Sequence, residues 1–302
     1  MLEIRRCADT DEKARWLAIY NEVVPEHAVA LEDVERWESA HVASVDFLGL
    51  LDDEPAGSAS AAISHARPAA ARTFLTVLPA RRRRGLGSAL YGAVSAWAAE
   101  HGASELLARI SEGEPESLAF AERRGYRVIA RDSNLVLDLT GLEPLPVDPP
   151  AGVEIVRWAD RPELARGLHE ATFEANPDVP GSEDWAGEPF DAWERLHRPE
   201  LMFVAVTGDD VVGFAELLAT EARPGVAVHM MTGVRRAWRR RGIAGALKRA
   251  QIAWAKAAGY ERLETANELR NEPIRRLNER LGYREGPGRV EVRGPLAASD
   301  VP

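Results

Sequence analysis

The hydrophobic pattern of the C-terminal half alternates between two periods. Short apolar runs bounded by turn residues predict strands, and apolar residues three or four positions apart predict helices. The expected strands are 153–158, 202–206, 211–219, 226–234 and 262–267. The expected helices are 162–173, 185–196, 242–258 and a helix capped by Asn271 with Ile274, Leu277 and Leu281 on its inner face. This order, β-α-α-β-β-β-α-β-α-β, predicts a mixed α/β fold.

The first half of the chain repeats this pattern. "LEIRRCAD" at residues 2–9 and "VEIVRWAD" at residues 153–160 share Glu, Ile, Arg, Ala and Asp in the same order. Further along, six residues recur with identical spacings, namely Arg82, Gly85, Trp97, Gly102, Gly125 and Tyr126 as Arg239, Gly242, Trp254, Gly259, Gly282 and Tyr283. Such a repeat predicts two copies of one domain. We expect the domains to span residues 1–145 and 151–302, joined by the proline-rich segment 143–150.

Composition narrows the class of protein. The chain has 302 residues, 45% hydrophobic content and a formal net charge of -10, which is typical of a globular protein and argues against nucleic acid as a partner. It contains no apolar run long enough to cross a membrane, no apolar signal segment at its start and one cysteine, Cys7. We expect a cytoplasmic monomer or homodimer without a membrane partner. The histidines are too scattered for a zinc helix, so no metal site is predicted.

Positive charge gathers where each copy begins its central helix. "RRRRGLG" at 81–87 and "RRRGIAG" at 239–245 both run from arginines into small residues. A helix start carries unpaired N–H groups and partial positive charge, and small residues allow an anion to approach the backbone. The pattern lacks the Gly-Lys-Ser/Thr of a Walker loop and the third glycine of a dinucleotide fingerprint. It therefore predicts a site for a compact polyanion, although a solvated helix start is the alternative.

These residues resemble a known family. R-x-x-G-x-G (Arg82, Gly85, Gly87) and R-x-x-G-x-A (Arg239, Gly242, Ala244) resemble the acetyl-coenzyme A signature of the GNAT superfamily of N-acetyltransferases. The closing "RRGYRV" and "RLGYRE" resemble the Gly-Phe/Tyr segment of the same family. The resemblance covers both halves and implies two tandem domains, each a mixed, splayed β-sheet flanked by helices.

The resemblance also implies a cosubstrate, acetyl-coenzyme A, and the residues that hold it. Its pyrophosphate would lie on the helix start, and its pantetheine amides would pair with the strand before the signature, which splays from its neighbour. The implied residues are Leu75, Val77, Arg82, Gly85 and Gly87 in the first copy and Thr232, Val234, Arg239, Arg240, Arg241, Gly242, Ile243, Ala244, Gly245 and Asn271 in the second. For Asn271 a plain helix cap is the alternative.

The implied reaction is attack of an amine on the acetyl thioester, which requires a proton acceptor. Glu216 and His229 lie on strands that are expected to flank the thioester, and both are candidate bases. A solvent-facing glutamate and a packed histidine are the alternatives. The corresponding residues of the first copy are Ser60 and Arg72, which are unsuited to this role. The backbone N–H of Val234 is a candidate donor to the oxyanion.

The family often supplies a tyrosine as thiol donor, four residues before the final glycine. This chain departs from that pattern, because it has Ala121 in the first copy and Asn278 in the second. Asparagine donates a hydrogen bond but is no acid, so Asn278 or water would take the place of tyrosine. Thr265, Asn267 and Asn278 would then line the acetyl end. Mycothiol synthase resembles this two-domain arrangement, but its closing segment carries the missing tyrosine, so that activity is not implied.

The acceptor is expected to be a small-molecule amine. In the family the first helices and their loop shape the acceptor side. The segment 173–193 is acidic through Asp178, Glu183, Asp184 and Glu188, and Trp185 and Trp193 give it flat apolar faces. Acidic residues beside aromatic walls suit a cationic amine, although a solvated loop with two core tryptophans is the alternative.

Two hypotheses for the function remain. The first is an acetyl-coenzyme A-dependent N-acetyltransferase in which the second copy is catalytic and the first is degenerate. The second is a non-catalytic acyl-coenzyme A sensor or interaction module. The intact signature of the second copy and Glu216 favour the enzyme, and the missing tyrosine favours the sensor.

Overall fold

The computed structural model describes residues 1–143, 145–180, 182 and 185–298. The chain divides into two compact units. The first unit holds Met1–Ile129 and the segment that begins at Val290, and the second unit holds Ala130–Arg289. Each unit contains a mixed sheet flanked by helices, so the predicted fold class of two tandem mixed α/β domains is confirmed.

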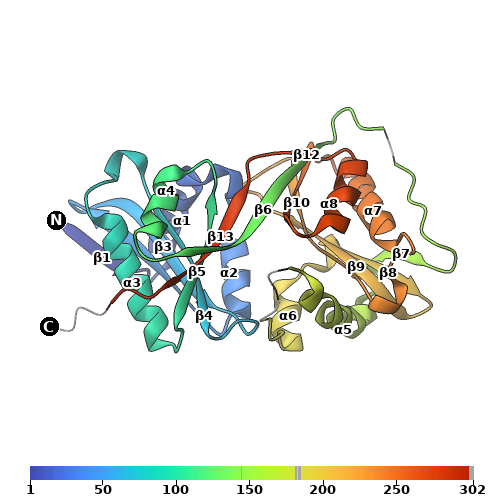
Figure 1. Ribbon diagram of the computed structural model, residues 1–302, viewed down its shortest axis with the longest axis horizontal. Coiled ribbons are helices and arrows are strands. Elements are labelled where there is room, and N and C mark those ends of the chain that lie inside the picture. The colour runs from blue at the N-terminus through green and yellow to red at the C-terminus, as the bar shows by residue number, and fades with distance from the viewer. Residues whose placement is uncertain (144, 181, 183–184, 299–302) are drawn as a thin grey trace. The chain divides into compact units, whose positions relative to one another are not determined.

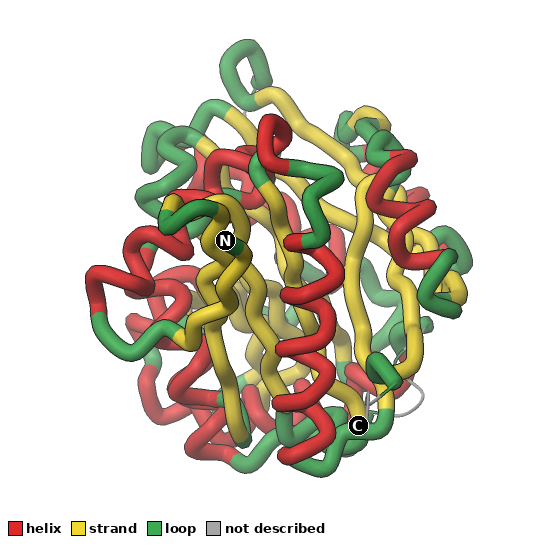
Figure 2. The backbone as a smooth tube through the Cα atoms, turned by 90° about the vertical axis from the view of Figure 1, so that its left-hand side faces the viewer, coloured by secondary structure: helices red, strands yellow, loops and turns green. Residues whose placement is uncertain are grey.

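The strands of the first unit follow the order β1-β2-β3-β4-β5-β13. Only the β4–β5 pair is parallel among the four pairs from β1 to β5. Figure 2 views the chain from the side of this unit and shows a helix lying lengthwise along the strands. Its elements are β1 (Leu2–Arg6), α1 (Thr10–Val23), α2 (Leu31–Ala40), β2 (Ala43–Leu51), β3 (Glu54–Ile63), β4 (Ala70–Val77), α3 (Leu86–Glu100), β5 (Glu105–Ser111), α4 (Pro115–Glu122) and β13 (Arg289–Pro295).

The strands of the second unit follow the order β6-β11-β10-β9-β8-β7, with β12 also pairing with β6. The β10–β11 pair is parallel. The elements are β6 (Arg127–Asp138), β7 (Glu154–Arg157), α5 (Ala165–Ala175), α6 (Phe190–Leu196), β8 (Met202–Thr207), β9 (Asp210–Ala219), β10 (Val226–Val234), α7 (Ile243–Ala257), β11 (Arg262–Glu268), α8 (Glu272–Arg280) and β12 (Arg284–Glu285).

The two copies exchange their closing strands. β6 follows α4 in the chain, yet it pairs antiparallel with β11 of the second unit, from Asp132 opposite Glu268 to Asp138 opposite Arg262. β13 follows α8, yet it lies beside β5 in the first unit. The expected boundary at 143–150 groups both strands with their own sequence copies, whereas the compact units group them with the other copy. A strand's alternating pattern specifies which face is buried, not which sheet it joins.

Helices cover both faces of the sheet in the second unit (Figure 1). On one face, Val212 and Leu217 of β9 pack with Leu247 of α7. On the other face, Phe214 of β9 packs with Leu168 of α5 and with Trp193 of α6. In Figure 1, α7 and α8 accordingly lie on one side of the strands, and α5 and α6 lie on the other. We call these the α7 face and the α5 face.

Two expected segments differ from the structure. The helix predicted for 185–196 begins only at Phe190, because Gly187 adopts a left-handed φ of 88° and Pro189 forms the N-cap. The second segment is the proline-rich join, which packs against the second unit. Leu142 and Leu145 pack against the core of the second unit, and the Lys256 ammonium donates to the Leu142 carbonyl. Among the described helices, none has the length and apolar content needed to cross a membrane.

Candidate active site

Two turns with the same backbone geometry lead into α3 and α7. Arg83 and Gly85 have φ of 63° and 86°, and Arg240 and Gly242 have φ of 62° and 88°. Left-handed residues in such close succession turn backbone N–H groups into one concavity, which attracts anions. A left-handed arginine is strained by roughly 1–2 kcal/mol. Both copies therefore hold the same costly conformation at the predicted anion site.

The two helix starts differ in their unpaired donors. In α7 the first helical bond runs from the Ala246 N–H to the Gly242 carbonyl at 3.0 Å, so the N–H groups of residues 243–245 precede the helical ladder. In α3 the Ser88 N–H already donates to the Gly85 carbonyl at 3.0 Å. The second unit thus presents one more donor to an anion than the first unit does.

The signature arginines hold the turns in place. Arg239 Nε donates to the Val234 carbonyl at 2.9 Å, and Arg82 Nε donates to the Val77 carbonyl at 3.3 Å. Each side chain thereby ties its turn to the end of the preceding strand. The sequence predicted only a nearby positive charge for these residues. The structure shows in addition that each arginine makes the same hydrogen bond to the end of the preceding strand.

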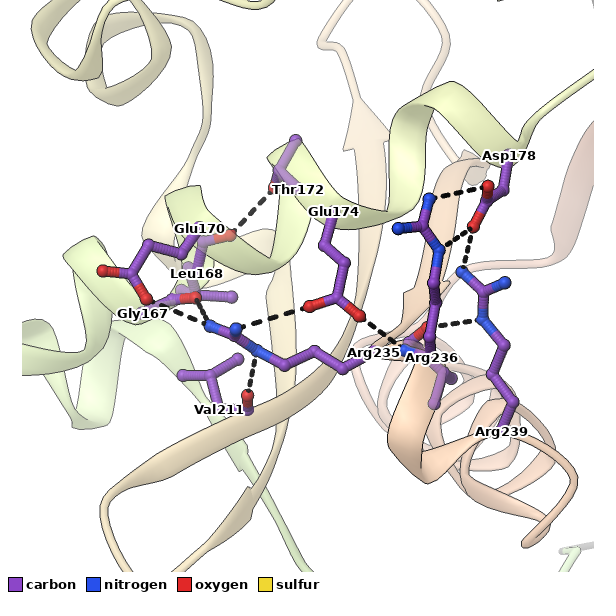
Figure 3. A network of polar contacts seen from close by, with 11 residues as sticks. Gly167, Leu168, Glu170, Thr172, Glu174, Asp178, Val211, Arg235, Arg236 and Arg239 are labelled. Atoms are coloured by element: carbon purple, nitrogen blue, oxygen red, sulfur yellow. Dashed lines mark hydrogen bonds and ion pairs between the residues drawn. The ribbon is translucent and has the colours of Figure 1, made fainter.

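The Asp178 carboxylate forms ion pairs with arginines rather than lining an acceptor site. It accepts two hydrogen bonds from Arg236 and one from Arg239, the latter at 2.6 Å (Figure 3). These bonds lower the pKa of Asp178 to about 2. The prediction that Asp178 attracts a cationic amine is therefore revised, because its charge is already neutralised. Glu183 and Asp184, which carried the same prediction, lie outside the described residues.

Strand splay leaves free backbone groups beside both turns. β4 and β5 pair only from Ala70 opposite Glu105 to Arg72 opposite Leu107. β10 and β11 pair only as far as His229 opposite Thr265. Beyond these points both strands of each pair continue without a shared ladder.

The open edge carries the residues predicted for the pantetheine arm. Because the Arg235 N–H donates to Val212 of β9, strand alternation turns the N–H groups of Thr232 and Val234 to the opposite edge. In the first unit the Leu78 N–H donates to the Ala56 carbonyl of β3, so Leu75 and Val77 face the open edge in the same way.

A β-bulge distinguishes the second unit from the first. The β9–β10 register shifts between His229 and Thr232, whereas the β3–β4 register runs from Ile63 to Gly57 without a shift. A bulge inserts one residue and reverses which face the following side chains take. His229, which precedes the bulge, lies opposite Leu217 and bonds to Gln251 of α7, so it is on the α7 face, while its sequence counterpart Arg72 pairs with Glu291 at 3.1 Å.

Glu216 faces the other side of the sheet and has a partner that the sequence did not reveal. His197, the C-cap of α6, bonds through Nδ1 to Glu216 Oε1 at 2.7 Å. Desolvation lowers the pKa of His197, but the Glu216 carboxylate outweighs this effect and the net pKa is raised. A carboxylate can accept only from a protonated Nδ1, so Nε2 keeps a lone pair in the neutral ring. The pair can act as an oriented base.

His229 is unsuited to the same task. Its side chain is 3% exposed, and its Nδ1 donates to Gln251 Oε1 at 2.9 Å. Burial, together with the charge of Lys248, holds its pKa well below the ordinary value, so the ring stays neutral. Because Glu216 and His229 lie on opposite faces, the structure does not bring the two predicted bases together.

Lys248 lies in the same buried cluster as His229. It is 1% exposed, and its ammonium lies 5.5 Å from the centre of the Tyr283 ring. Burial lowers the pKa of Lys248 to about 7. Sequence reasoning missed both Lys248 and Gln251, although their positions on the inward arc of α7, beside Leu247, could have drawn attention to them.

Two of the predicted asparagines, Asn267 and Asn278, contact each other. Asn278 of α8 is fully buried, and its Nδ2 donates to Oδ1 of Asn267 on β11 at 2.5 Å. Thr265 lies two residues before Asn267, on the same face of β11, and is 3% exposed. Asn271 takes the N-cap position of α8, but within the described residues its side chain makes no capping bond.

Comparisons with known proteins agree with this geometry. The sequence profile of the acetyltransferase (GNAT) family matches residues 13–126 and 164–283. No curated protein sequence matches the chain. A solved tandem GNAT protein from the clavulanic acid biosynthesis pathway, without AcCoA, is 24% identical with a TM-score of 0.80, over 99% of this chain and 100% of that chain.

Two further solved structures show the same fold. A GCN5-related N-acetyltransferase from Sphaerobacter thermophilus is 24% identical with a TM-score of 0.74, over 98% of this chain and 96% of that chain. A glucosamine N-acetyltransferase region of a fungal multi-domain β-N-acetylglucosaminidase is 14% identical with a TM-score of 0.72, over 97% of this chain and 38% of that chain.

The glycine at the start of α7 can be tested against a matched glycine at its end. Gly242 and Gly259 have φ of 88° and 85°, and an added Cβ would meet open space in the described chain at either position. We expect Gly242→Ala and Gly259→Ala to lose the same stability, about 1–2 kcal/mol. Only Gly242→Ala should weaken coenzyme A binding, by about tenfold, because its methyl group lies where a phosphate must approach. Chemical unfolding and calorimetry measure the two effects, and equal loss of binding in both variants would contradict the assignment.

Lys248 makes stability depend on pH. Its pKa is about 7 in the folded chain and about 10.4 when unfolded, so between these values the unfolded state binds more protons and stability rises with pH. Lys248→Met removes this dependence. We expect the gain in unfolding free energy between about pH 7.5 and pH 9 to be smaller in the variant by about 2 kcal/mol. Parallel unfolding curves for the two proteins would show that the amine is not desolvated.

Proposed function

Since the chain belongs to the acetyltransferase (GNAT) family, we propose that it is an acetyl-coenzyme A-dependent N-acetyltransferase that acts on the amine of a small molecule. We assign the reaction to the second unit. The observation that carries this assignment is the Glu216–His197 pair on the α5 face, together with the bulged, open edge of β10.

The second unit fits acetyl-coenzyme A in three respects. The N–H groups of residues 243–245 precede the helical ladder of α7 and suit a pyrophosphate. Gly242 leaves the concavity open, since a Cβ there would project into empty space in the described chain. Thr232 and Val234 turn backbone donors and acceptors to the open edge, where pantetheine amides could pair. When bound, the cosubstrate supplies the acyl group as an activated thioester.

His197 would remove a proton from the acceptor ammonium. Glu216 orients the ring through Nδ1, leaving Nε2 to take the proton, and it stabilises the imidazolium that results. The Val234 N–H would donate to the carbonyl oxygen as negative charge develops there. The Arg239 side chain bonds to the Val234 carbonyl, which belongs to the next peptide group, and so holds the end of the strand beside this N–H.

Asn278 would orient the leaving side without acting as an acid. One of its Nδ2 hydrogens is held by Asn267, which leaves the second free to donate. The proton for the thiolate would then come from water. His229 takes no chemical step in this scheme, because it is buried and neutral on the opposite face.

The acceptor side has one charged base and a cluster of aromatic rings. His169 and Phe190 each lie within van der Waals range of Trp193, with ring centres 5.5 Å and 6.2 Å apart. The His197 ring lies tilted by 44° against the same tryptophan, with ring centres 4.7 Å apart. Trp193 is 1% exposed and packs in the core of the α5 face, so it supports His197 from behind and does not itself line an acceptor site.

A non-catalytic acyl-coenzyme A sensor is the second candidate. It is favoured by the residues in the thiol-donor position, Ala121 and Asn278, since neither can protonate a thiolate. The release of free thiol from acetyl-coenzyme A across a library of amines decides between the two functions. Binding without thiol release would favour the sensor.

The base can be tested by its pH dependence. As pH rises through the raised pKa of His197, the ring loses its proton and activity should increase. His197→Gln should lower kcat by about a hundredfold or more and flatten this rise. Glu216→Gln should shift the rise to lower pH, because the carboxylate that raises the pKa is gone. An unchanged profile in both variants would exclude the pair as the base.

The division of labour between the units has its own test. Gly242→Glu places a carboxylate in the α7 turn and should abolish turnover, since it repels the phosphates. Gly85→Glu makes the matched change at the α3 turn, where φ is 86°, and should largely spare turnover. The opposite ranking in steady-state kinetics would place the reaction in the first unit.

A further inference from the structure

The first unit contains a small cavity that the proposed reaction does not use. It has a volume of about 50 Å³ and lies where β3, β4 and β5 meet the end of α2. Its lining is His41, Ala62, Ser64, Arg67, Ala70, Arg72 and Leu107. Four of these side chains carry polar groups, and in the described residues Nδ1 of His41 is buried without a hydrogen-bond partner.

Among the described residues, guanidinium groups outnumber the one carboxylate in the ion-pair cluster beside this cavity. Glu291 of β13 is 8% exposed and accepts a hydrogen bond from Arg72 at 3.1 Å. Arg109 lies 3.7 Å from its other oxygen, and Arg67 lies 3.6 Å away. Even without Arg67, one carboxylate faces two guanidinium groups.

The surplus affects the groups that face the cavity. Desolvation and the charge of Arg109 lower the pKa of Arg72. Burial lowers the pKa of His41, the charge of Glu38 opposes this effect, and the charges of Arg72 and His65 add to it. The Arg72 and Arg109 side chains keep 37% and 43% of their surface exposed, so an anion would replace water at Arg72 rather than relieve a buried charge.

The size and shape of the cavity select among anions. A buried water needs about 10–15 Å³, so the cavity of about 50 Å³ has room for roughly three to five groups of that size. A guanidinium presents a planar fork of donors that matches the two oxygens of a carboxylate. Ser64 accepts from the Arg67 N–H at 3.2 Å and keeps its own O–H to donate.

We propose that the first unit binds a small carboxylate in this cavity, held by Arg72 and by the polar groups of His41 and Ser64. The ligand is acetate-sized, or it is the carboxylate end of a larger molecule. This face of the unit carries Ser60 where the second unit carries Glu216. The duplicated fold therefore presents a cationic site in one unit and an anionic base in the other, which gives the copies different ligands. The proposal does not depend on the acyltransfer reaction.

The test uses the full chain and sodium acetate as the probe, with sodium chloride at matched ionic strength. We expect a saturable rise in melting temperature with acetate beyond that with chloride, and a calorimetric binding isotherm. Arg72→Gln should weaken acetate binding by about tenfold or more, which is the effect of losing one charge-assisted hydrogen-bond pair. Arg15→Gln alters an exposed arginine of α1 and should bind acetate as the native chain does.

A second variant keeps the test valid if Arg72→Gln fails to fold. Ala62→Val adds two methyl groups to the cavity wall, suits a strand and leaves every ion pair in place. It should abolish acetate binding while the melting temperature without acetate stays near the native value. Equal effects of acetate and chloride, no saturation, or unchanged acetate binding in Ala62→Val would each overturn the proposal. A larger carboxylate that binds more tightly than acetate would identify the ligand as the end of a larger molecule.

Discussion

The site depends on unpaired backbone N–H groups at the start of α7, held in place by the turn before it. Gly242 makes that turn possible, because its φ of 88° is readily available only to glycine. Arg239 fixes the turn against the strand, through its bond to the Val234 carbonyl. The same bond holds the peptide group that follows the Val234 N–H, the donor that we assign to the oxyanion. Arg239 thus connects the anion-binding turn to the end of the open edge of β10. A displacement of one is expected to displace the other.

The second constraint is the bulge in β10, which separates two chemistries on two faces of one sheet. The extra residue between His229 and Thr232 turns His229 inward to Gln251 and leaves Glu216 on the α5 face with His197. The first unit has no such bulge, and Arg72 there pairs with Glu291 instead. A single inserted residue therefore accounts for much of the difference between the two copies.

Patterns that act over short distances in the chain predicted most of the fold. The glycines and arginines of the two turns, the strand and helix order and the α7 face of Ile243 and Leu247 were all readable, because each depends on neighbours a few residues away. The sequence did not predict the partner of Glu216. His197 lies at the end of α6, with β8 between it and β9, and no sequence spacing connects the two residues. The exchange of β6 and β13 was also hidden, because both strands carry a pattern that suits either sheet.

Strand exchange makes each sequence copy part of the other unit. β6 supplies the strand beside β11, and β11 carries Asn267, which holds Asn278 in the second unit. If the second copy were produced without the first, its sheet would lack β6, and the edge of β11 would be exposed. The first copy is therefore part of the second unit's sheet, whatever ligand it holds itself.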